Sequence, residues 1–189
     1  MDHIYKNIDG YFRETDKSVY DRMVHWYKDG DIFVEVGSFK GKSASIMAVN
    51  IANSKKNIKF YCVDTWDGMP EHQKGAIYED PDTVSGKLFY HFLKNTESLS
   101  NYITPIRKPS VEAANDFEDK SLAFVYIDAL HDYENVKKDI EAWYPKIKYG
   151  GTLAGHDWNF IDVAKAVVEF SEEKKLKLYN NTSWEILIT

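Results

Sequence analysis

Acidic side chains stand at the ends of four apolar runs in this sequence. They are Glu35, Asp64, Asp128 and Asp157, the last of them preceded by His156. One such acid alone is usually a helix cap or a solvated loop residue, but four in equivalent places favour a shared site. Carboxylates accept hydrogen bonds from hydroxyl groups, take up protons and ligate hard cations. The set could therefore bind a polar ligand and support acid–base or metal-assisted chemistry.

The motif E-V-G-S-F-K-G, which starts at Glu35, lies between an apolar run and a helix-forming run. It predicts a strand, a tight turn and a helix, the unit with which an open α/β sheet binds a nucleotide-like ligand. A dinucleotide site clusters its glycines, whereas here Ser38 and Phe39 separate Gly37 from Gly41. The preceding acid would repel a diphosphate. The motif favours a ligand with a positive charge and an amino-acid head group.

Asp64 ends the next apolar run and is expected beside the glycine turn. Its two acceptor oxygens suit the neighbouring hydroxyl groups of a ribose. Trp66 follows two residues later and could lie against an adenine face, or pack inside the loop.

Asp128 and Asp157 are expected to end adjacent strands, so their carboxylates should converge in one cleft. Two uncompensated carboxylates repel each other, and a divalent cation such as Mg²⁺ or Mn²⁺ would remove the repulsion. Without a metal, His131 is the natural base, because it lies three residues after Asp128 and histidine titrates in the useful range. We therefore predict that Asp128, His131 and Asp157 are the catalytic residues.

Alternating apolar runs and amphipathic stretches position these side chains. The predicted strands are 32–36, 58–63, 103–107, 122–128, 152–155, 176–179 and 184–188, with a turn at 150–151. The predicted helices are 18–28, 43–52, 84–99, 111–117, 133–143 and 163–173, with Ser110 as the cap of the fourth. Strands separated by single helices predict a mostly parallel sheet with helices on both faces. The last two strands are joined by a turn of hairpin length, so one of them must run antiparallel.

Composition narrows the class of protein. The 189 residues are 43% hydrophobic and 15% aromatic, which excludes a disordered chain and predicts one domain spanning 1–189. A net charge of −6 with scattered lysines argues for a small-molecule acceptor and against nucleic acid. No apolar run approaches the ~18 residues of a membrane span, and no secretory signal is recognisable, so we expect a cytoplasmic protein.

Two segments are candidates for covering the site. Residues 65–85 form a polar stretch too long for an ordinary connection, which predicts a lid or binding loop. Residues 1–30 are rich in aromatic side chains and are expected to form a helical cap over the site or a homodimer contact.

Three stretches together resemble the class I S-adenosylmethionine-dependent methyltransferases, in particular the compact family that includes sugar and antibiotic-tailoring O-methyltransferases. They are V-E-V-G-S-F-K-G-K-S from Val34, C-V-D-T-W-D-G from Cys62, and the segment 126–158, which contains I-D-x-x-H-x-Y-E and G-G-x-x-x-G-H-D-W. The resemblance implies a Rossmann-like, seven-stranded sheet whose last strand is antiparallel.

The resemblance also implies which residues bind S-adenosylmethionine: Glu35, Gly37, Ser38, Gly41 and Ser43 at the methionine end, Asp64 at the ribose, Trp66 and Ser110 at the adenosine, and Asp128. Metal-dependent catechol O-methyltransferases ligate the metal with acids at the positions of Asp128 and Asp157 and with an amide directly after the second acid. Trp158 occupies that place here, and Asn159 or His156 is the candidate third ligand.

The resulting expectation is methyl transfer from S-adenosylmethionine to an oxygen of a small hydroxylated metabolite, of sugar or natural-product type, assisted by a divalent metal. Two alternatives stay open. One is a metal-independent methyltransferase with His131 as base, and the other is a different Rossmann-type nucleotide-binding enzyme.

Overall fold

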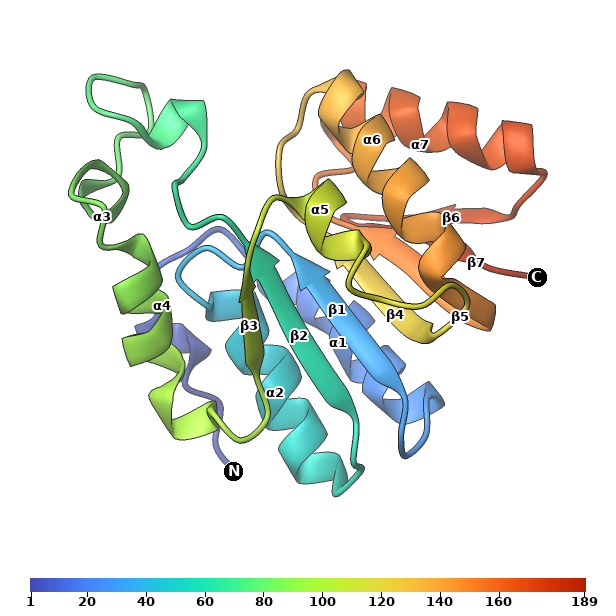
Figure 1. Ribbon diagram of the computed structural model, residues 1–189, viewed down its shortest axis with the longest axis horizontal. Coiled ribbons are helices and arrows are strands. Elements are labelled where there is room, and N and C mark those ends of the chain that lie inside the picture. Colours follow the sequence, from blue (N-terminus) through green and yellow to red (C-terminus); the bar gives the residue numbers. More distant parts are fainter.

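The computed structural model describes the backbone of residues 1–189 and every side chain except that of Glu14. One seven-stranded sheet runs through the molecule with helices on both faces (Figure 1). Its strands lie in the order β3-β2-β1-β4-β5-β7-β6. They are β1 (Ile32–Val36), β2 (Lys59–Asp64), β3 (Thr104–Arg107), β4 (Leu122–Ile127), β5 (Ile147–Gly155), β6 (Leu178–Asn180) and β7 (Trp184–Leu187).

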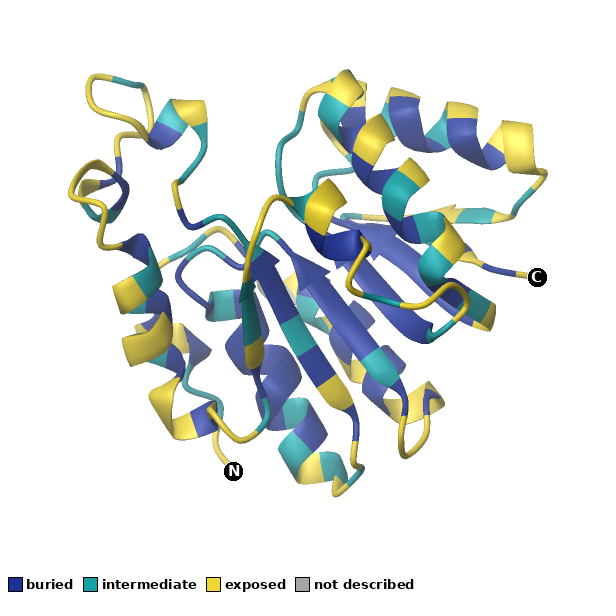
Figure 2. Cartoon of the chain, in the orientation of Figure 1, coloured by how far each residue is buried: buried dark blue, intermediate teal, exposed yellow. Residues whose placement is uncertain are grey.

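Helices α1, α2 and α4 pack on one face of the sheet, and α5, α6 and α7 pack on the other. The α-helices are α1 (Glu14–Trp26), α2 (Lys42–Ser54), α3 (Pro81–Val84), α4 (Leu88–Thr96), α5 (Ser110–Ala114), α6 (Tyr133–Trp143) and α7 (Ile161–Lys174). The central strands bury both faces: Phe33 and Phe124 lie in one core cluster, and Val34 and Val125 in the other. Figure 2 shows this as dark strands between helices whose outer surfaces are exposed. Burial on both faces is why these strands are continuous apolar runs in the sequence.

The predicted mixed sheet is confirmed. Strand β1 pairs in parallel with β2 and β4, while β3 and β5 extend the parallel part on either side. Strands β6 and β7 form the predicted hairpin, and β7 runs antiparallel to both β6 and β5. The carboxyl ends of the parallel strands therefore meet at one edge of the sheet.

The predicted turn at Gly150 and Gly151 is wrong. Both residues lie inside β5, where the pairing with β4 has a register irregularity. Gly150 has a φ of +75°, which lets the strand bulge without breaking.

Two helix predictions are also corrected. The predicted helix 84–99 divides into α3, α4 and a 3₁₀ turn at 97–99, because Gly86 with a φ of +68° separates α3 from α4. Ser110 is the first residue of α5 rather than its cap, and Pro109 occupies the capping position. In addition, α1 begins four residues earlier than expected, at Glu14.

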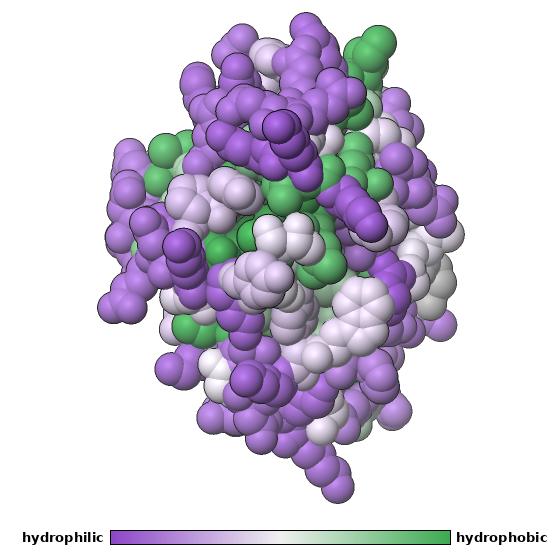
Figure 3. All heavy atoms as spheres, turned by 90° about the vertical axis from the view of Figure 1, so that its right-hand side faces the viewer, coloured by the Kyte–Doolittle hydropathy of each residue, from purple (hydrophilic) through white to green (hydrophobic). Residues whose placement is uncertain are grey.

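Strand β6 forms one edge of the sheet. Figure 3 views the side of the molecule that lies on the right in Figure 1, where apolar side chains gather in the middle of a hydrophilic surface. The exposed apolar side chains of β6 and of its neighbour β7 include Tyr179 and Leu187. Within the described part of the chain, no helix has the length and apolar character needed to cross a membrane.

Gly37 brings two strand ends into direct contact. Its N–H donates to Val63 O at 2.8 Å, and its φ is +90°. A Cβ at this position would lie 1.9 Å from Asp128 O. Any side chain would therefore separate the turn after β1 from the loop after β4.

We expect Gly37→Ala to lower the free energy of unfolding by roughly 2–4 kcal/mol, because it adds a clash with rigid backbone to the strain of a positive φ. Gly30→Ala is the matched control, since Gly30 has a φ of +83° and open space around it. Its cost should be about 1 kcal/mol, from backbone strain alone. Urea unfolding measures both, and equal losses would contradict the close approach at Gly37.

Candidate active site

A cavity of about 670 Å³ opens at the carboxyl edge of the parallel strands. This volume lies in the range of small-molecule sites. Its lining includes several residues singled out in the sequence: Gly37, Ser38, Ser43, Asp64, Ser110, Asp128, His131, His156 and Asp157. The structure thus brings both predicted parts of the site, the ligand-binding turn and the acid cluster, into one space.

Glu35 lies behind this lining rather than in it. It is the fourth residue of β1, 1% exposed, and its Oε2 accepts a 2.6 Å hydrogen bond from the Tyr20 hydroxyl of α1. Burial raises the pKa of Glu35 to about 7, although hydrogen bonding opposes the shift. Ser38 and Ser43 interact with the same carboxyl group and also lower its pKa. The turn after β1 and the start of α2 therefore enclose Glu35.

Asp64 is held rigidly at the end of β2. Its Oδ2 accepts from Phe39 N at 2.9 Å, and its Oδ1 accepts from Trp66 N at 2.7 Å. Burial raises the pKa of Asp64, and these backbone hydrogen bonds oppose the rise. A backbone hydrogen bond from Ser38 adds to these, and one lone pair of the carboxylate is left to accept from a hydroxyl group.

Trp66 does not lie where a ligand could reach it. The indole is 1% exposed, packs against Phe89 and Phe92 at 4.6 and 4.7 Å, and donates to Phe39 O at 2.8 Å. It is a core residue that anchors the turn to α4. The expectation that it borders an adenosine is corrected, because its ring is enclosed by other aromatic side chains.

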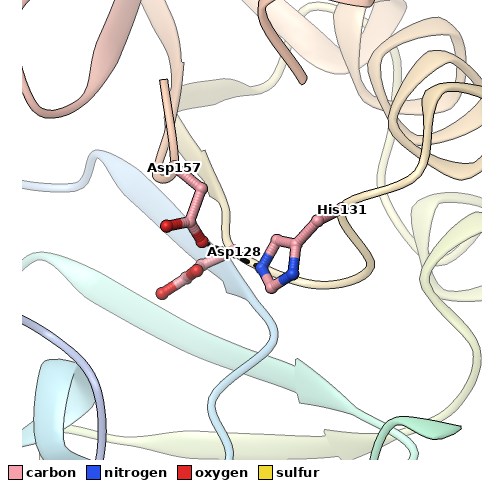
Figure 4. A group of neighbouring side chains, drawn as sticks. All are labelled: Asp128, His131 and Asp157. Atoms are coloured by element: carbon pink, nitrogen blue, oxygen red, sulfur yellow. Dashed lines mark ion pairs between the residues drawn. The ribbon is translucent and has the colours of Figure 1, made fainter. Parts of the chain in front are cut away.

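Asp128, His131 and Asp157 meet at the cavity wall from the loops after β4 and β5 (Figure 4). His131 Nε2 lies 2.9 Å from Asp157 Oδ2. Burial alone would lower the pKa of His131, but the contact with Asp157 raises it. Asp157 has a φ of +53°, a conformation that non-glycine residues adopt rarely and that is typical of functional sites.

His156 connects three carboxylates. Its Nε2 lies 2.8 Å from Asp16 Oδ2, and its Nδ1 lies 3.1 Å from Asp157 Oδ2 and 3.5 Å from Asp128 Oδ1. Burial alone would lower the pKa of His156, but these acids raise it to about 11, so the imidazole is a cation at neutral pH. Burial raises the pKa of Asp128 to about 6. Burial would also raise the pKa of Asp157, but hydrogen bonds from His131 and His156 hold it well below its usual range.

The charged His156 lies where a metal ion was expected to neutralise the acids. The expected repulsion between Asp128 and Asp157 is offset by His156, a group of the protein itself. Single ligand atoms of Asp128, His131 and Asp157 nevertheless lie within 4.8 Å of one another, a spacing that could hold a metal ion. Asn159 is exposed and lies outside the cavity lining, so the structure does not bring this predicted ligand to the cluster.

Asp16 is one site residue that was not predicted from the sequence. It is fully buried in α1 and also lies 3.3 Å from the Ser183 hydroxyl. Its spacing could have indicated this role. Asp16, Tyr20 and Met23 lie on one face of a helix, and an acid on an apolar face needs a partner.

Lys40 holds the walls of the cavity together. Its ammonium group lies 3.1 Å from Asp9, 2.5 Å from Asp80 and 3.1 Å from Asp82. Asp9 belongs to the N-terminal segment and the other two acids to residues 65–85, and both segments line the cavity. The lid and cap roles of these segments stay predictions.

We expect His156→Gln to lower the free energy of unfolding by roughly 3–5 kcal/mol at pH 7, because it leaves Asp16 buried without its cation. The pKa of His156 is raised on folding, so its contribution is complete below the unfolded pKa of 6.5 and is lost as the pH rises toward 11. The difference from the parent protein should therefore shrink between pH 7 and pH 11 in urea unfolding. His25→Gln, on an exposed residue, is the control and should change stability by less than about 0.5 kcal/mol. A pH-independent difference would show that His156 is uncharged.

Comparison with known proteins places the chain in one family. The pattern of the family described as methyltransferase domain matches residues 34–158. A curated relative, the uncharacterized protein y4gI of Sinorhizobium fredii, is 27% identical over 124 residues, which cover 66% of this chain and 13% of the relative. The chain thus spans about an eighth of the length of that relative.

Solved structures share the fold. The O-methyltransferase NovP superposes with a TM-score of 0.70 at 15% identity, covering 92% of this chain and 79% of NovP. SMU.1697c from Streptococcus mutans, solved in complex with SAH, gives 0.63 at 12% identity and covers 94% of this chain and 99% of its own. The calicheamicin methyltransferase CalS11 gives 0.65 at 13% identity, with 93% and 80% covered.

Proposed function

This chain belongs to the methyltransferase-domain family, and from that premise we propose that it transfers the methyl group of S-adenosylmethionine to a hydroxyl oxygen of a small acceptor molecule. The observation that carries the proposal is the single cavity lined both by the glycine turn with Asp64 and by the His131–Asp157 pair. One part suits a nucleoside with an amino-acid tail, and the other can accept a proton.

The residues at the carboxyl edge fit the methyl donor. Ser38 lines the cavity, and Glu35 lies behind it in β1. Burial raises the pKa of Glu35 to about 7, so a positively charged ligand beside the turn would favour its ionised form. The remaining lone pair of Asp64 suits a ribose hydroxyl group. When bound, S-adenosylmethionine supplies a methyl sulfonium that is already activated for transfer.

His131 is the residue that we propose as the base. Its Nε2 is paired with Asp157, which leaves Nδ1 as the nitrogen that takes the proton of the acceptor hydroxyl. The ring also stacks on Phe160 at 5.1 Å, which limits its rotation. Asp157 orients the imidazole and stabilises its protonated form, and His156 holds Asp157 in place.

A divalent cation held by Asp128, Asp157 and His131 is the second candidate, supported by the 4.8 Å spacing of their ligand atoms. Mg²⁺ or Mn²⁺ there would lower the pKa of the acceptor hydroxyl and direct its oxygen. In that arrangement His131 would be a ligand and could not act as the base. The two candidates therefore predict opposite effects of chelation.

We further propose that the acceptor is a small molecule rather than nucleic acid. The net charge of −6 supports this, as does the engagement of Lys40, one of the three lysines that line the cavity, by three carboxylates. Because its ammonium group is already paired, Lys40 is not free to bind the phosphate groups of a nucleic acid.

Calorimetric titration tests the donor. We expect S-adenosylmethionine to bind and NAD to bind far more weakly, and Asp64→Asn to weaken binding of the donor about tenfold or more because one ribose acceptor is lost. Asp67→Asn, on an exposed neighbouring acid, should leave the affinity unchanged. Tighter binding of NAD than of S-adenosylmethionine would contradict the proposal.

A screen of hydroxylated metabolites with labelled donor would identify an acceptor and allow the base to be tested. We expect His131→Gln to reduce kcat by roughly 10²–10⁴-fold and chelators to have no effect. Because the pKa of His131 is raised, kcat of the parent protein should rise with pH through and above 6.5 and then level off. Loss of activity on chelation, restored by Mg²⁺ or Mn²⁺, would favour the metal instead.

A further inference from the structure

A carboxylate interrupts the buried face of α6. The buried residues of this helix are Val136, Asp139, Ile140 and Trp143, which follow the helical spacing of a core-facing stripe. Asp139 is only 5% exposed and lines the cavity. A buried charge on an apolar stripe is costly and calls for a partner.

The described part of the protein offers Asp139 no cationic partner. Among the residues that the structure describes, no lysine, arginine or histidine forms an ion pair with Asp139. Asp139 forms a hydrogen bond with Ser110 and is repelled by Asp132. Burial raises the pKa of Asp139 to about 6, so the group is mostly ionised at neutral pH and needs hydrogen-bond donors.

Ser110 orients the carboxylate toward the cavity. The Ser110 Oγ accepts a 2.9 Å hydrogen bond from the Trp143 indole, so its own proton is free for Asp139. Both Ser110 and Asp139 line the cavity. The remaining lone pairs of Asp139 are therefore available to a ligand.

The place of Ser110 and Asp139 along the cavity indicates which part of the methyl donor they would contact. Lys108 N donates to Asp64 O at 3.1 Å, so the segment leading to Ser110 begins beside the residue assigned to the ribose. The glycine turn lies on the other side of Asp64, since Phe39 N donates to it. In this order the amino-acid tail lies at the turn, the ribose at Asp64, and the base near Ser110 and Asp139.

We propose that Asp139 accepts a hydrogen bond from the exocyclic amino group of the donor's adenine and so selects an amino-purine over an oxo-purine. This inference rests on the proposed function. A carboxylate has only acceptor atoms, so it pairs with an amino group. A purine with a carbonyl oxygen at the same place would present a second acceptor and leave both groups buried without a donor.

Binding of the two demethylated products measures this directly, without any acceptor. We expect the parent protein to bind S-adenosylhomocysteine about a hundredfold more tightly than S-inosylhomocysteine in calorimetric titration. Asp139→Asn offers an amide that can face either purine, so the ratio should fall to about tenfold or less. Glu141→Gln, on an exposed acid of the same helix, should keep the parent ratio.

A second variant guards against misfolding of the first. Ser110→Ala removes the hydroxyl that orients Asp139 and should also reduce the preference for S-adenosylhomocysteine over S-inosylhomocysteine. Its affinity for S-adenosylhomocysteine should fall less than that of Asp139→Asn. Equal binding of both products by the parent protein, or an unchanged ratio in Asp139→Asn, would overturn the inference while leaving the proposed function intact. Binding of neither product would remove the proposed function itself.

Discussion

The site depends on one constraint: parallel strands deliver their carboxylates to the same edge of the sheet, and the resulting charges must be neutralised. Asp128 and Asp157 follow adjacent strands, and Asp16 of α1 is buried against the same point. His156 lies among all three and touches each with a ring nitrogen. The geometry of His131 depends on this arrangement, because the carboxylate that orients it is itself held by His156. A charged network of this kind is costly to leave incomplete, which makes the site rigid.

The geometry of the same edge also depends on a glycine, Gly37, because it has no side chain. Gly37 lets the turn after β1 approach the backbone of Asp128, so the ligand-binding turn and the acid cluster share one wall. Lys40, two residues further than Ser38, then ties the N-terminal segment and residues 65–85 to that turn. The ligand-binding turn and the acid cluster are therefore held in fixed relative positions by a few neighbouring residues.

Much of this could be predicted from local sequence. Continuous apolar runs predicted the buried strands, the short final turn predicted the hairpin, and acids at strand ends predicted the cavity. Residues whose role depends on burial could not be predicted in this way. Trp66 follows a strand like a binding residue but is enclosed by α4. Asp139 and Asp16 lie on helices, and only the packing of those helices brings their carboxylates to the site. The need for a metal was inferred from two acids, because the sequence alone did not reveal that His156 lies between them.

The pairing of Asp16 with His156 and Ser183 has a consequence for synthesis on the ribosome. These partners are 140 and 167 residues away along the chain. A nascent chain that has released α1 and the first strands still lacks the groups that neutralise the buried Asp16 carboxylate, so α1 cannot dock stably. Docking must wait until β5 and the final hairpin have emerged. Helix α1 thus docks late although it is synthesised before the whole sheet, and the active site is completed only after the hairpin of β6 and β7 has emerged.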